Sequence, residues 1–254
     1  MSEMYRRFFL FPDILIMLVL LIGISGYIIA QPFSWSMLLF FCIGLIVFSF
    51  SEYFTHRFLF HLPPPKNVFG RKLLKRLHYD HHAHPNELHL LFLPVWYSLP
   101  NLGFFAVVTY LLTQSVVLTA AAASGLIVML LVYEWKHYVA HVPLKPRTRF
   151  GKWMKKTHLL HHFKNEHYWF GVSNPVGDWL FGTLKDEKTV LSSQTARDLE
   201  KELDNKKTAD PLISGFLFIE RATWHVESYR VQVDAQSMAI RRSTRYTFER
   251  SRRP

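Results

Sequence analysis

The 254-residue sequence is 50% hydrophobic and 19% charged, with a formal net charge of +11. Its charges are unevenly distributed, because residues 14–51 and 90–133 contain no Asp, Glu, Lys or Arg. A bilayer core of about 30 Å needs roughly 20 apolar residues per helix, so each stretch is long enough to cross twice. This pattern excludes an ordinary soluble domain and predicts an all-α membrane protein with about four transmembrane helices.

The four expected spans lie near residues 13–30, 34–52, 94–112 and 116–135. Gln31-Pro32 divides the first apolar stretch and residues 113–115 divide the second, whereas Pro94 and Pro100 make a re-entrant third span an alternative. Both dividing loops are short and uncharged, and the remaining segments carry every charge. A hairpin topology therefore places both termini and the charged segments on one side, which the positive-inside rule predicts to be the cytoplasm.

Histidines are concentrated in the charged segments that follow the second and fourth spans. Of 14 histidines, ten fall into four clusters, which are His56 and His61; His78, His81 and His82; His137 and His141; and His158, His161 and His162. On an α-helix, positions three and four apart share a face, so the imidazoles of one cluster can converge. His56 and His61 are five apart and converge only if the helix ends or bends between them, and the prolines from Pro63 supply a stop.

Clustered neutral imidazoles indicate metal binding, because imidazole is the commonest protein ligand for transition metals and suits iron, zinc and copper alike. Ten ligands exceed the coordination sphere of one ion, so we expect two ions. Glu52 precedes His56 by four residues and Glu134 precedes His137 by three, so either carboxylate could accept the free ring N–H of a ligand. His84 and His89 are weaker candidates for that role. The sequence shows no motif for an organic cofactor.

Basic residues gather around the histidines, in residues 55–89 and 134–185. In a soluble protein this charge would suggest nucleic acid as a partner, but here it lies at the expected membrane face, so we expect no nucleic acid. Anionic lipid headgroups, an acidic substrate headgroup or an acidic electron donor would be attracted there, and plain positive-inside bias is the alternative. Residues 71–78 and 152–158 alternate apolar and basic positions at helical spacing, which predicts interfacial helices.

The chain changes character after residue 185. Residues 1–185 form a membrane-embedded domain, and residues 186–254 form a polar, basic C-terminal extension to which we assign no function. In this extension we expect a helix near 194–207 and strands near 213–220 and 229–240. Just before it, residues 170–183 are rich in turn residues and aromatics and are expected to close over the metal site.

The histidine clusters resemble the motifs of the membrane-bound fatty acid hydroxylase superfamily, which includes sterol desaturases and hydroxylases, and most closely those of fatty acid 2-hydroxylases. The matching motifs are Glu52-Tyr53-x-x-His56-Arg57-Phe58-Leu59-Phe60-His61, Leu77-His78-x-x-His81-His82, His137-Tyr138-x-x-His141, and His158-x-x-His161-His162-Phe163 followed by Phe170-Gly171-Val172-Ser173. The resemblance covers roughly residues 45–184.

The resemblance implies a non-haem di-iron monooxygenase on a four-helix membrane scaffold, with a cytoplasmic histidine-rich helical cap that holds the di-metal centre. Residues 1–185 are then the hydroxylase domain, and the ten histidines hold two iron ions, with zinc as an alternative occupant in a purified sample. The implied reaction is hydroxylation of a long acyl chain, in a fatty acid or sphingolipid and near carbon 2, with O2 and external electrons. The alternative is a sterol or carotenoid hydroxylase or desaturase. A metal transporter is less favoured, because its ligands should lie at the bilayer midplane.

We expect the electron donor to be a separate protein, either a cytochrome of the b type or a ferredoxin. Many relatives in the superfamily carry a fused cytochrome domain of that type, for which this sequence has no room. The single cysteine, Cys42, cannot hold an iron–sulfur cluster alone. The expected location is the bacterial inner membrane, or the endoplasmic reticulum in a eukaryote.

Overall fold

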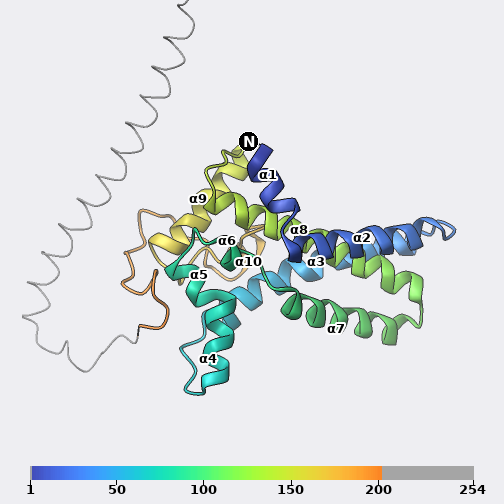
Figure 1. The fold of residues 1–254 in the computed structure, drawn as a ribbon, viewed down its shortest axis with the longest axis horizontal. Helices are drawn as coiled ribbons and strands as arrows, with labels where there is room; N and C mark the ends of the chain where they lie inside the picture. Colours follow the sequence, from blue (N-terminus) through green and yellow to red (C-terminus); the bar gives the residue numbers. More distant parts are fainter. Residues whose placement is uncertain (1, 202–254) are drawn as a thin grey trace, which may run out of the picture. The chain divides into compact units, whose positions relative to one another are not determined.

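A computed structural model describes residues 2–201, and every regular element in that range is a helix (Figure 1). Four segments are long and apolar enough to cross a membrane, namely Pro12–Ile29, Trp35–Phe60, Leu88–Thr113 and Val116–His141. The predicted all-α membrane fold and its four spans are thereby confirmed. The second and fourth segments run beyond their predicted ends and carry His56 and His137 within them.

The helices follow one another with short connections, and several begin at a capping side chain. In chain order they are α1 (Ser2–Phe9), α2 (Pro12–Ile29), α3 (Trp35–Phe54), the π-helix η1 (Thr55–Phe60), α4 (Val68–Leu74), the π-helix η2 (Lys75–Tyr79), α5 (Asp80–Ala83), α6 (Leu88–Leu91), α7 (Val95–Thr113), α8 (Val116–His141), α9 (Arg149–Phe163) and α10 (Val176–Leu180). Ser34, Ser115 and Thr148 accept backbone N–H groups at the starts of α3, α8 and α9. Such caps satisfy donors that a helix start otherwise leaves free.

The central helix is α8, against which α2, α3 and α7 all pack. The backbones of α8 and α3 are in direct contact at two glycines. A Cβ at Gly44 of α3 would lie 2.2 Å from the Ala122 carbonyl oxygen, and one at Gly125 of α8 would lie 2.1 Å from the Phe41 carbonyl oxygen. Small residues permit this close approach of membrane helices. The contact fixes the ends of α3 and α8 relative to each other, and both helices run from it toward the histidine clusters.

The third span is one continuous helix, so the re-entrant alternative is wrong. α7 passes through Pro100 without interruption and ends at Gln114, which has a left-handed backbone conformation (φ 50°). A proline inside a helix removes one backbone hydrogen bond and favours a bend.

The connections α2–α3 and α7–α8 lie at one end of the long helices, whereas α4, α5, α6, α9 and α10 lie at the opposite end and form the cap (Figure 1). The amino-terminal helix α1 also packs at the cap end. The Phe8 ring lies 5.0 Å from the Trp135 ring, and the Tyr138 hydroxyl donates to the Met4 carbonyl. The stretches expected to be interfacial helices are α4 continuing into η2, and part of α9.

Residues 186–201 pack with the rest of the described chain in one compact unit. The Trp169 indole N–H donates to the Lys185 carbonyl, and the Ser193 N–H donates to the Lys164 carbonyl at 2.7 Å. Residues 194–201 form turns and bends instead of the predicted helix, so that prediction is wrong over this stretch. The rest of the predicted helix, to residue 207, and both predicted strands lie outside the described residues.

Candidate metal centre

The first histidine of each of the first two clusters lies in a π-helical turn. His56 lies in η1 and His61 ends it, whereas His78 lies in η2. In a π-helix each N–H bonds to the carbonyl five residues earlier, so residues five apart lie on nearly the same face. This widened turn brings the His56 and His61 ring centroids to 5.1 Å from each other. The two rings therefore converge as expected from a helix that ends between them, and the π-helical turn before that end brings them to the same side.

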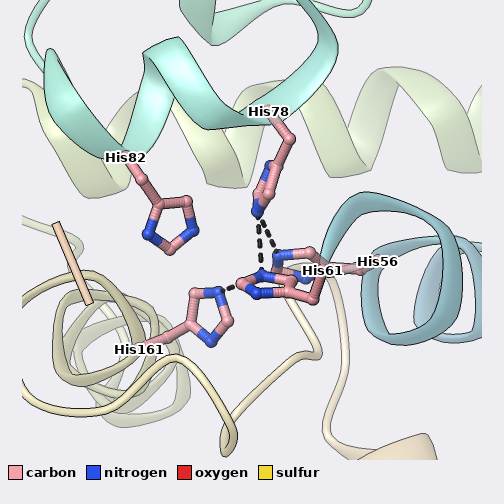
Figure 2. Close-up of side chains that lie close together, drawn as sticks. All are labelled: His56, His61, His78, His82 and His161. Carbon is pink, nitrogen blue, oxygen red and sulfur yellow. Dashed lines mark hydrogen bonds between the residues drawn. The ribbon is translucent and has the colours of Figure 1, made fainter. Parts of the chain in front are cut away.

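The ten clustered histidines gather into two groups of five. The His56 centre comprises His56, His61, His78, His82 and His161, and the His137 centre comprises His81, His137, His141, His158 and His162. Within each group, one nitrogen from every ring lies within 4.8 Å of the others. Figure 2 shows the His56 centre, in which rings from three separate helical segments point to one space. Two adjacent pairs, His81-His82 and His161-His162, each supply one ring to each centre.

The distances between ring nitrogens fit one metal ion in each centre. Four Nε2–Nε2 distances are 2.8–3.0 Å, between His61 and His161, His61 and His78, His137 and His81, and His141 and His158. Two nitrogens bound at about 2.1 Å to one ion, and about 90° apart, lie about 3.0 Å from each other. The Nε2 atoms of His82 and His162 are buried without a hydrogen-bond partner, which an ion would supply. The residues present therefore fit the metals that the family implies.

Burial keeps the cap imidazoles neutral. It lowers the pKa of His82 to about 3. It also lowers, well below the usual value, the pKa of the other cluster histidines outside the spans, which are His61, His78, His81, His158, His161 and His162. Desolvation is the main cause, and the neighbouring imidazoles add repulsion. Because neutral imidazole is the form that binds a metal, these rings are in the binding form at pH 7.

Backbone carbonyls orient four of the rings. Each of these rings faces a carbonyl oxygen with its Nδ1, at 2.5–2.8 Å: His56 faces Phe170, His82 faces Ala196, His137 faces Leu91, and His161 faces Tyr168. A carbonyl only accepts, so Nδ1 carries the proton and Nε2 is left free for an ion.

Glu52 and Glu134 do not occupy the acceptor positions expected for them. The Glu52 carboxylate accepts from the backbone N–H groups of Val172 and Ser173, and Glu134 accepts from that of Leu93. His84 and His89 are exposed and belong to neither centre. Residues 170–173 lie beside the His56 centre, where the Phe170 ring is 5.3 Å from the His61 ring.

A cavity reaches the His56 centre from the membrane-spanning region, between α3 and α7 and against α8. It is lined by Phe48, Ser51, Glu52, Thr55, His56, Phe60, Leu93, Tyr97, Ser98, Asn101, Leu102, Phe105, Leu130 and Tyr133. His56 is the one clustered histidine in this lining. Most of the walls are apolar, Glu52 is the one carboxylate, and Lys and Arg do not contribute. No sequence pattern marks this cavity, because its walls are ordinary residues of apolar spans.

A sequence model described as fatty acid hydroxylase matches residues 41–183, the range that holds both centres and the whole cavity. The chain belongs to the fatty acid hydroxylase family. Fatty acid 2-hydroxylase of Homo sapiens is 34% identical over 172 residues, which cover 67% of this chain and 45% of that protein. Dihydroceramide fatty acyl 2-hydroxylase FAH1 of Arabidopsis thaliana is 32% identical over 155 residues, or 60% of this chain and 63% of that protein. The chain thus spans about half the length of these relatives.

A solved structure agrees with the hydroxylase fold. It is a structure of full-length scs7p in which only the hydroxylase domain is visible, and it aligns with a TM-score of 0.64 and 26% sequence identity. The alignment covers 71% of this chain and 68% of that chain. These comparisons confirm the resemblance to fatty acid 2-hydroxylases that the histidine motifs suggested.

Proposed function

We propose that this member of the fatty acid hydroxylase family is an O2-dependent lipid hydroxylase that acts at carbon 2 of a long acyl chain. The observation that carries the proposal is a cavity between the spanning helices that ends on His56, one of ten imidazoles gathered in two centres. The two centres would each hold an iron ion, which supplies the oxygen chemistry able to break an unactivated C–H bond. One oxygen atom enters the product, and the other leaves as water with two electrons and two protons.

The position of the cavity supports reaction near the headgroup. Phe48 lies eight residues before His56 on a nearly continuous helix, so the cavity extends about 12 Å from the His56 centre toward the bilayer interior. A lipid keeps its headgroup at the membrane surface and its tail in the bilayer. Because the histidines lie at the cap ends of the spans, the carbons closest to the headgroup are the ones that come nearest to them.

The cavity lining favours a neutral acyl linkage over a free fatty acid. A free carboxylate beside carbon 2 would lie near Glu52 with no Lys or Arg in the lining to pair with it. An unpaired buried charge is costly, whereas an amide needs only hydrogen bonds. Ser98 offers a buried hydroxyl that has no partner of its own. We therefore infer an N-acyl lipid, such as a ceramide, as the substrate class, in line with the name of the plant relative.

The cap is proposed to face the cytoplasm and to receive electrons from a separate protein, a cytochrome of the b type or a ferredoxin. The side chains of Lys145, Arg147, Arg149 and Lys152 are exposed, and they lie between α8 and the first turn of α9. None of them forms an ion pair within the described residues. This basic segment begins just after His141, a residue of the His137 centre, and would attract an acidic donor.

The test uses the purified full chain in lipid nanodiscs, loaded with ferrous iron, with a reductant and an N-acyl sphingoid base under 18O2. Mass spectrometry should find a 2-hydroxyacyl product that carries one 18O atom. His161→Ala and His141→Ala, one from each centre, should insert normally but form no product. An iron-loaded wild-type chain that yields no oxygenated lipid would contradict the proposal, and a desaturated product would favour the desaturase alternative.

A further inference from the structure

Four carboxylates are buried in the described part of the chain: Glu52, Glu134, Glu166 and Asp178, with 2–7% exposure. None of them bonds to a ligand imidazole. Each one instead holds a chain segment whose carbonyl accepts from the Nδ1 of a ligand. Glu166, for example, accepts from the Ser193 and Thr195 hydroxyls, next to the Ala196 carbonyl that His82 faces.

The segment beside His56 is held most completely. One oxygen of Glu52 accepts from the N–H groups of Val172 and Ser173, both at 2.7 Å, and the other accepts from the Ser173 hydroxyl. Asp178 accepts from the N–H groups of Phe170 at 2.9 Å and Gly171 at 2.7 Å. Four consecutive N–H groups are thereby fixed, so the Phe170 carbonyl is held in its direction toward His56.

The His137 centre has a corresponding arrangement with one acid. Glu134 accepts from the Leu93 N–H at 3.0 Å, and the Leu91 carbonyl, two residues earlier, faces His137 Nδ1 at 2.8 Å. Glu134 lies one turn before His137, as Glu52 lies one turn before His56. In both centres a carboxylate and a ligand on the same helix are therefore joined through a separate backbone segment.

We propose that Glu52 and Glu134 are positioning residues, one for each centre, which act on the ligands His56 and His137 through the carbonyls of Phe170 and Leu91. A carbonyl fixes the imidazole tautomer without adding a negative charge to the ligand. The carboxyl oxygens instead accept from backbone N–H groups, and these hydrogen bonds offset part of the cost of burying them. Loss of either acid should loosen the segment that bears one carbonyl, let one ring turn, and weaken metal binding in one centre only. This inference rests on the proposed function only in that both centres bind metal.

Cobalt binding tests the inference without any turnover, because the visible spectrum of Co2+ reports its ligand geometry. The metal-free full chain in nanodiscs is titrated with Co2+, and wild type is expected to bind two ions. Glu52→Ala should weaken the His56 centre about 10–100-fold, the usual effect of losing such an outer partner, and leave the His137 centre intact. Glu134→Ala should do the reverse, so the spectra of the ions retained by the two variants should sum to the wild-type spectrum.

Conservative variants separate positioning from a general structural role. Glu52→Gln and Glu134→Gln keep an oxygen for the backbone N–H groups and should bind both ions with wild-type affinity. Glu187→Ala is the matched control, because its carboxylate pairs with Lys156 and holds no carbonyl that faces a ligand. If Glu52→Ala fails to insert, Glu52→Asp decides: the shorter side chain draws the carboxylate back from the N–H groups of Val172 and Ser173, so the His56 centre alone should weaken.

An equal loss of Co2+ affinity at both centres, or no loss of affinity in either alanine variant, would overturn the inference. These results are separable from a failure of the proposed function. A wild-type chain that binds two ions but oxidises no lipid would contradict the hydroxylase assignment and leave the positioning roles standing. An active hydroxylase whose alanine variants bind both ions normally would contradict the positioning roles and leave the hydroxylase assignment standing.

Discussion

Leu102 faces the cavity from α7 and is nearly buried, with 9% exposure. In Leu102→Trp the indole should fill part of the cavity that His56 also lines and displace roughly three methylene groups of a bound acyl chain. At about 0.8 kcal/mol each, this loss of burial is about 2.4 kcal/mol, or roughly 50-fold in kcat/KM for a long-chain N-acyl substrate. Product formation with a long and a short acyl chain measures the effect, and iron content should stay at the wild-type level.

Leu99→Trp is the matched control for this prediction. Leu99 lies one turn from Leu102 on the same helix, but it is exposed and does not line the cavity. Equal activity of the two variants with long-chain substrate would remove the cavity from consideration as the acyl site.

The metal-binding residues could be predicted from the sequence because their role depends on residue type. The structure gathers the same ten histidines that cluster spacing singles out, because imidazole chemistry is a property of residue type. Four of these rings are oriented by backbone carbonyls, which belong to Phe170, Leu91, Tyr168 and Ala196. Every residue has a carbonyl, so no sequence signal separates these four from the rest. The carbonyls of Phe170, Leu91 and Ala196 lie in segments that buried acids hold through tertiary contacts.

At the scale of elements, the contact between α3 and α8 sets the distance between the histidine-bearing helix ends. Gly125→Ala should force the helices apart, because the added Cβ would meet the backbone oxygen of Phe41 at 2.1 Å and backbone cannot move aside cheaply. We expect a loss of about 1–3 kcal/mol in the free energy of unfolding, the usual cost of overpacking. Equilibrium unfolding of the purified protein measures this loss.

The control for the glycine contact is Gly23→Ala on α2, where an added Cβ meets nothing within 4 Å. This variant should match or exceed wild-type stability, since alanine favours a helix more than glycine does. If Gly125→Ala were as stable as Gly23→Ala, the helices would not be in the close contact described.

The positions of the helices could be predicted from the sequence, whereas the local geometry of their turns could not. The spans were recoverable because charge-free stretches of the required length have few alternatives in a bilayer. The π-helical turns η1 and η2 were not, because an extra residue in a turn has no local signature and depends on how the rings pack together. Lys155 shows a similar limit. It lies in a stretch whose alternation predicts an interfacial helix, but its ammonium group donates to the carbonyls of Val139, Val142 and Leu144, at and just after the end of α8.

For the whole molecule, the proposed cytoplasmic cap would put the two uncharged connections outside the cell in a bacterium. In a Cys42→Ser background, Gln114→Cys should react with a membrane-impermeant maleimide on intact cells, because it lies in the α7–α8 connection. Lys72→Cys, in α4 of the cap, should react only after the membrane is opened. Labelling of residue 72 in intact cells would reverse the orientation and place the cap outside.

The two centres face different surroundings, which bears on where electrons enter. The cavity is lined by His56 and so reaches the His56 centre. The His137 centre includes His141, which lies shortly before the basic segment 145–152. Lipid and electron donor would therefore approach different centres and would not compete for one surface. Lys75 and Lys156 are less suited to donor binding, because they already pair with Glu200 and Glu187.

Neutralising Lys145, Arg147, Arg149 and Lys152 together to Gln should slow reduction by an acidic donor about tenfold or more at low ionic strength, because these charges steer its approach. The wild-type rate should fall as salt screens the surface over about 8 Å, and the variant rate should depend little on salt. Stopped-flow absorbance of the donor measures both rates, and metal content should not change. The control neutralises three charges, Lys66, Arg71 and Lys72, which are also exposed but lie in α4 or just before it. If only this control slowed reduction, the donor would dock at α4, and entry beside the His137 centre would be wrong.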